Sequence, residues 1–159
     1  MATLPQLLEE DIQRMDDILR DYLERSDATT GLVIDKGGFL ITHRGDSRLY
    51  DLTTIGALAS GAFLANQTIA NLIHEEDFET VYQQGKKYSI FVTNIDENCL
   101  LLVIFPCSTG VGIVKYHAAA ARTSIARQLQ TAQARDPESG LDLSVMNMAD
   151  PSELFRKRA

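Results

Sequence analysis

The sequence predicts one α/β domain in which a five-stranded antiparallel sheet lies between helices, in the order α-β-β-α-β-β-β-α. Three long segments have apolar residues at helical spacing, and five short runs rich in β-branched and aromatic residues lie between them. The chain has 159 residues, of which 45% are apolar, enough for one domain with a buried core. We expect this domain over residues 1–135, followed by a flexible tail over 136–159.

The first helix is predicted over Leu4–Arg25. Its apolar residues recur at spacings of four and three, which places them on one face of a helix: Leu8, Ile12, Met15, Leu19 and Tyr22. The opposite face is mostly acidic, as expected of a helix side in contact with water.

A β-hairpin follows, with strands over Thr29–Asp35 and Phe39–His43. Gly37 and Gly38 in the connection accept the positive φ that a tight hairpin turn requires. Residues 32–34 are apolar without alternation, which indicates a strand covered on both faces.

Three further strands are predicted over Phe78–Gln84, Tyr88–Ile95 and Leu100–Phe105. The last is a continuous apolar run, typical of a central, doubly covered strand. A third helix over Thr109–Ala134 has an apolar stripe of Val114, Ala118, Ala121, Ile125 and Leu129. Its rim is basic where that of the first helix is acidic, so these two helices are expected side by side on one face of the sheet.

The second helix, predicted over Asp51–Ile73 with Asp51 or Thr53 as its N-cap, has no charged side chain from Leu52 to Ile73. Several polar residues lie within this stretch, which argues against membrane insertion. At 100° per residue, one side is assigned to the sheet: Leu52, Ile55, Ala59, Phe63, Asn66, Ala70 and Ile73. The opposite side carries small and apolar residues in place of charges: Thr54, Ala57, Leu58, Gly61, Leu64, Ala65, Thr68 and Leu72.

An uncovered apolar helix side of this kind predicts a protein interface, because a soluble protein rarely exposes a large apolar patch without a partner. The alternative is a helix buried on all sides within its own domain. A net charge of −7 disfavours nucleic acid and anionic lipid as partners.

The residues indicate no catalytic site, no metal site and no cofactor. His43, His74 and His117 stand in three different predicted elements, and Cys99 and Cys107 lack metal-ligand spacing. The two cysteines are expected as buried or half-buried thiols. Without a P-loop or a nucleophile elbow, the sequence favours binding over catalysis.

The segment from about Met15 to Thr131 resembles the Roadblock family, a fold related to profilin and longin domains, and within it the bacterial MglB-type branch. The matching segments begin at Gly31 (GLVIDKGG), Leu58 (LASG), Ile69 (IANLI), Leu101 (LLVIF) and Thr109 (TGVGIVK). The resemblance implies a cytoplasmic homodimer that extends its sheet across two chains and pairs the second helices on one face.

The resemblance also implies a function in bacterial cell polarity. Two copies of such a regulator bind one MglA-type Ras-like GTPase and accelerate GTP hydrolysis by repositioning the GTPase's own catalytic residues. The outward side of the second helix then binds the partner, and the strand with Phe78, Thr80 and Tyr82 forms the dimer edge.

The end of the tail is predicted to be a short helix-prone segment, with Asp150 as N-cap and Pro151 at the first helical position. Leu154 and Phe155 would anchor it on a partner, with Arg156 beginning a basic cluster. The resemblance links a Leu-Phe pair near the C-terminus to a second contact on the GTPase. A tail that only aids solubility is the alternative.

Two other functions remain open from the sequence. One is a Roadblock scaffold, such as a light-chain-type adaptor, without GTPase-activating activity. The other is a small-molecule sensor of PAS-like or profilin-like shape, which would need a pocket between helix and sheet. The alanine-rich helices are expected to leave little room for such a pocket.

Overall fold

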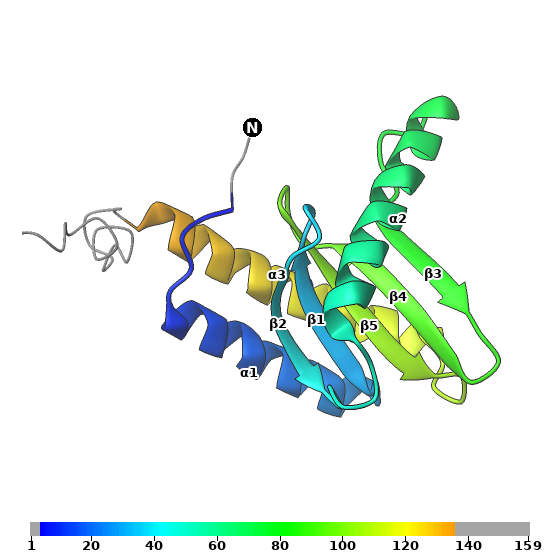
Figure 1. Ribbon diagram of the computed structural model, residues 1–159, viewed down its shortest axis with the longest axis horizontal. Coiled ribbons are helices and arrows are strands. Elements are labelled where there is room, and N and C mark those ends of the chain that lie inside the picture. The colour runs from blue at the N-terminus through cyan, green and yellow to red at the C-terminus, as the bar shows by residue number, and fades with distance from the viewer. Residues whose placement is uncertain (1–3, 136–159) are drawn as a thin grey trace, which may run out of the picture.

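The computed structural model describes residues 4–135 and confirms the predicted order of elements (Figure 1). The helices are α1 (Glu9–Ser26), α2 (Leu52–Leu72) and α3 (Val111–Ala134). The strands are β1 (Thr30–Asp35), β2 (Leu40–Gly45), β3 (Thr80–Gln84), β4 (Tyr88–Asn94) and β5 (Cys99–Pro106). They form one antiparallel sheet in the order β2-β1-β5-β4-β3.

The sheet separates two apolar cores. Helices α1 and α3 lie side by side on one face and α2 lies on the other, as the ribbon in Figure 1 shows. Strand β5 is central, and its residues 99–105 are all buried, as predicted from their unbroken apolar run. Along β1, Val33 packs on the α1–α3 side while Leu32 and Ile34 pack under α2, which confirms a strand covered on both faces.

Helix α1 begins at Glu9, five residues later than predicted. Pro5 disfavours helical backbone at the preceding Leu4, but it would itself suit a first helical position, so the later start has another cause. The Asp11 carboxylate accepts a hydrogen bond from the backbone N–H of Leu8 at 2.8 Å, which fixes the first turn. Leu4 packs against the α1–α3 core without being helical.

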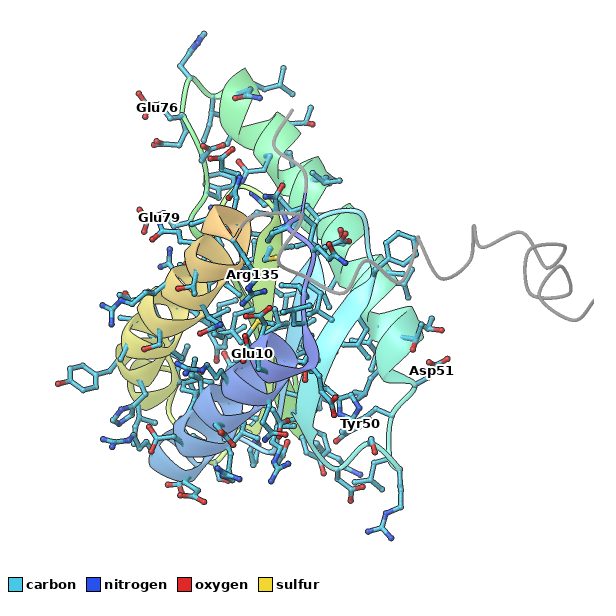
Figure 2. All side chains as sticks on the ribbon, turned by 90° about the vertical axis from the view of Figure 1, so that its left-hand side faces the viewer. Glu10, Tyr50, Asp51, Glu76, Glu79 and Arg135 are labelled. Carbon is cyan, nitrogen blue, oxygen red and sulfur yellow. The ribbon has the colours of Figure 1, made fainter. Side chains whose placement is uncertain are left out.

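The predicted pairing of α1 with α3 is confirmed, and polar contacts link the two helices. Tyr22 donates its hydroxyl to the carbonyl of Val114 at 2.9 Å. The fully buried Asp11 accepts hydrogen bonds from Arg135 at 2.9 and 3.0 Å and from Gln128 at 2.6 Å. The hydrogen bond from Arg135 is the main reason that the pKa of Asp11 falls to about 2. Figure 2 shows Arg135 with Glu10, its second carboxylate partner at 3.3 Å.

Helix α2 lies very close to the β1–β2 hairpin at its first turns. Asp51 is the N-cap, and its carboxylate accepts from the backbone N–H of Thr54 at 3.1 Å. A Cβ at the buried Gly56 would lie 3.0 Å from a methyl group of Ile34, so a side chain there would force the helix away. Together these contacts position α2 on the sheet.

Within residues 4–135, no helix combines the length and the apolar character that crossing a membrane requires.

Candidate partner interface

All eight residues predicted on the outward face of α2 are exposed. The three leucines among them are the most apolar: Leu58, Leu64 and Leu72 are 69%, 49% and 75% exposed. Between them lies Gly61, where an added Cβ would meet nothing within 4 Å, so another protein can approach the helix backbone closely. The helix is therefore not buried on all sides within the single chain.

The assignment of Ile73 to the sheet is wrong, because its side chain is 62% exposed. Helix α2 ends at Leu72, and the chain leaves the helical direction at His74, which has a positive φ of 64°. Ile73 therefore lies just after the helix and outside its sheet-facing side. Ile69 is also 49% exposed, three turns beyond Leu58 on nearly the same side of the helix. Helical periodicity alone could have placed Ile69 on the apolar surface.

The sheet side of α2 includes two buried residues that the apolar pattern missed. Gly56 is one, and Ser60 is the other: its hydroxyl donates to the carbonyl of Lys36 at 2.6 Å. The predicted Leu52, Phe63 and Ala70 are buried, as expected. Apolar periodicity could not identify Gly56 and Ser60, because it depends on the positions of large apolar side chains.

An apolar groove of about 270 Å³ lies between α2 and the outer strands, next to the outward face. This corrects the expectation that the alanine-rich helices leave little room at the sheet. The groove arises because α2 packs mainly over β1, β2 and β5, leaving part of β3 and β4 uncovered. Its lining comprises Ile55, Leu58, Ala59, Ala62, Phe63 and Asn66 of α2, with Val81, Gln83, Ile90, Val92 and Leu102 of the sheet.

Strand β3 forms one edge of the sheet, and the hydrogen bonds at its ends fix which backbone groups face outward. The N–H of Gly85 donates to the carbonyl of Tyr88 at 3.1 Å, and the N–H of Asn94 donates to the carbonyl of Glu79 at 3.1 Å. Because backbone groups alternate along antiparallel strands, the odd-numbered residues of β3 bond to β4. Thr80, Tyr82 and Gln84 therefore direct their N–H and C=O groups to the free edge.

Two of the three predicted edge residues, Thr80 and Tyr82, lie at these outward positions. The strand begins at Thr80, two residues later than predicted, and Phe78 precedes it. The carbonyl of Phe78 accepts from the side-chain amide of Gln67 at 3.0 Å, which directs it toward α2. The ring of Tyr82 stacks on that of Phe105, with centroids 6.1 Å apart.

The two cysteines lie in different surroundings. Cys99 is fully buried, and desolvation raises the pKa of its thiol to about 12, so it stays protonated and unreactive. Cys107 is half-buried and donates its thiol to the carbonyl of Gly85 at 2.8 Å. Among residues 4–135, no group of three His, Cys, Asp or Glu side chains is placed to hold a metal ion. The predicted tail contacts Leu154, Phe155 and Arg156 lie outside the described residues.

The fold matches solved structures of MglB proteins. An MglB in a tetrameric arrangement is 26% identical, with a TM-score of 0.77 over 83% of this chain and 99% of that chain. The gliding protein MglB of Thermus thermophilus is 26% identical, with a TM-score of 0.75 over 82% of this chain and 99% of that chain. Myxococcus xanthus MglB, at 24% identity, has a TM-score of 0.76 over 82% of this chain and 98% of that chain.

No curated protein matches the chain in sequence. The family model of the Roadblock/LC7 domain matches residues 15–105, from the middle of α1 to the end of β5. This segment holds the whole sheet, helix α2 and the free edge of β3. The chain belongs to the Roadblock/LC7 domain family.

Proposed function

We propose that this protein is a non-enzymatic, homodimeric regulator of an MglA-type Ras-like small GTPase, acting in the cytoplasm. The observation that carries the proposal is the outward face of α2, which exposes leucines and small residues over 21 helical residues without a single charge. An exposed apolar surface of this kind stabilises a complex when a partner covers it. The likeness to MglB structures supports a GTPase as that partner.

The dimer forms through β3. Its outward backbone groups at Thr80, Tyr82 and Gln84 meet those of a second copy and extend the sheet across both chains. The grooves beside the two α2 helices then share a floor made of β4 and β3 from each chain. One GTPase binds across this surface and contacts both α2 helices.

The regulator raises the rate of GTP hydrolysis by holding the GTPase's own catalytic residues in place. Helix α2 has no arginine, so its outward face offers no cationic side chain to the transferred phosphoryl group. Restricting mobile catalytic loops of the GTPase is a route that needs only shape and apolar contact. The tail residues Leu154, Phe155 and Arg156 make a second contact on the GTPase.

The experiment is a titration of a purified MglA-type GTPase, loaded with GTP, with the full-length protein. We expect binding that is stronger to the GTP form than to the GDP form, and a higher rate of phosphate release at saturation. Light scattering at micromolar concentration should return twice the chain mass of 17.6 kDa.

The outcomes separate the candidate functions. Binding without faster hydrolysis would support a Roadblock adaptor and contradict the activating role. A dimer that binds neither nucleotide form of the GTPase would contradict the proposed partner. A monomer at micromolar concentration would contradict the dimer.

A further inference from the structure

Strand β3 has opposite charges at its two ends. The α2–β3 connection before the strand carries four exposed acids, Glu75, Glu76, Asp77 and Glu79, while the turn after it carries two exposed bases, Lys86 and Lys87. In Figure 1 the connection and the turn lie at opposite ends of the edge strand. Within residues 4–135, none of these six side chains has an ion-pair partner.

Backbone contacts hold the basic turn in place. The carbonyl of Lys87 accepts from the N–H of Cys107 at 2.9 Å, and the carbonyl of Gly85 accepts from the thiol of the same cysteine at 2.8 Å. A side chain at Gly85 would collide with the carbonyl oxygen of Tyr88, so the turn needs glycine there. The turn therefore presents its two lysines from a fixed position.

The acidic connection is fixed by contacts of the same kind. The carbonyl of Glu79 accepts from the N–H of Asn94 at 3.1 Å and from the hydroxyl of Thr93 at 3.2 Å. The carbonyl of Phe78 accepts from Gln67, and the N–H of Glu75 donates to the carbonyl of Ala70 at 2.9 Å. Both charged segments thus keep their places relative to the edge of β3.

The edge geometry limits how a second copy can pair. A two-fold axis perpendicular to the sheet pairs a residue of β3 with its own copy, and the outward residues Thr80, Tyr82 and Gln84 must meet each other. Centring the axis on Tyr82 overlaps the whole strand and places Thr80 opposite Gln84. Continuing outward, the same register places Glu79 opposite Gly85 and Phe78 opposite Lys86, so the acidic connection of one copy lies beside the basic turn of the other.

We propose that these two charged segments form an electrostatic clamp between two copies of the chain, with the acidic connection of each copy against the basic turn of the other. The inference rests on the dimer proposed above. It adds the charges that make the two β3 strands pair antiparallel and that make β3 pair with β3 and not with another edge. The clamp forms twice, once at each end of the paired strands.

The charges favour this pairing over the alternatives. Parallel pairing of two β3 strands would bring acid against acid and base against base, which repel. The other sheet edge, β2, lacks this polarity, because the loop that follows it carries Asp46 and Arg48 paired with each other at 3.7 Å. Charge complementarity thus selects antiparallel self-pairing of β3 and disfavours other edges.

The test is a charge swap. One variant reverses the acids (Glu76→Lys with Asp77→Lys) and the other reverses the bases (Lys86→Glu with Lys87→Glu). We expect each variant alone to self-associate about tenfold more weakly than wild type, because the acid reversal leaves the connection without net charge and the base reversal brings acid against acid. Mixed in equal amounts, the two should form a heterodimer about as tight as the wild-type dimer, and wild type itself should weaken as salt rises.

Sedimentation measures all three dissociation constants, and native mass spectrometry identifies the heterodimer in the mixture. The control matched to the acid reversal is Glu24→Lys with Glu97→Lys, which makes the same change in net charge at exposed acids outside β3 and its flanking segments and should leave the dimer unchanged. If wild type is a dimer and both variants self-associate as tightly as the control, the clamp is wrong and the dimer stands. If wild type is a monomer, both proposals fail.

Discussion

The two faces of the sheet differ in how the outer sides of their helices are built. On one face, α1 carries charges that pair locally, such as Asp17 with Arg20 and Asp21 with Arg25, and α1 and α3 cover each other's flanks. On the other face, α2 lies alone, carries no charge and exposes leucines. The outward side of α1 is charged, whereas the outward side of α2 is uncharged and apolar, and this contrast is the reason we propose a partner for α2.

The largest predicted effect is a difference in the free energy of unfolding between substitutions on the two sides of α2. Phe63→Ala removes a buried ring from the core beneath the helix and should lower the free energy of unfolding by about 3–5 kcal/mol. Leu64→Ala, on the adjacent outward position, should change it by less than about 0.5 kcal/mol. Denaturant unfolding measures both. Equal losses would mean that Leu64 is part of the folded core, contrary to its exposure.

The second prediction concerns the α1–α3 face and its buried carboxylate. The pKa of Asp11 is about 2 in the folded chain against an ordinary 3.8, so its ionised form stabilises the fold above about pH 4. That contribution is lost as the pH falls from about 4 to about 2. Thermal unfolding of wild type and Asp11→Asn should differ most near neutral pH and converge in acid. A difference that stays constant between neutral pH and pH 2 would contradict the assignment.

The smallest predicted effect concerns the tail. Truncation after Arg135 keeps the contacts of that side chain with Asp11 and Glu10 on α1 and removes only residues 136–159. We expect the dimer and the stimulation of hydrolysis to remain, while any effect on nucleotide exchange is lost with Leu154 and Phe155. Light scattering and nucleotide-release kinetics check this. Unchanged hydrolysis and exchange would leave the tail without a role at the GTPase.

Much of the fold could be predicted from the sequence because large apolar residues dominate it. The stripe from Val114 to Leu129 on α3 and the continuous run of β5 each fix an element and its burial. The absence of charge between Leu52 and Ile73 likewise identified the exposed helix side. In each case one strong physical pattern extends over several turns or a whole strand.

The remaining details depend on contacts between distant segments. Ser60 is buried because a carbonyl of the β1–β2 hairpin accepts its hydroxyl, and Ile73 is exposed because α2 outruns the sheet. The groove depends on where α2 crosses the strands. Which residues of β3 direct their backbone groups to the free edge depends on the turn at Gly85. Periodicity within one segment cannot specify any of these.

We propose that the outward face of α2 binds a GTP-loaded Ras-like GTPase. Gly61 and Gly112 are matched positions, since both are exposed helical glycines whose added Cβ would meet nothing within 4 Å, one on α2 and the other on α3. We predict that Gly61→Arg weakens binding at least about tenfold, because an arginine buried there has no counter-charge, and that Gly112→Arg leaves it unchanged. Titration of both folded variants with the GTP-loaded GTPase measures this directly. Equal affinity of wild type and Gly61→Arg would contradict the account.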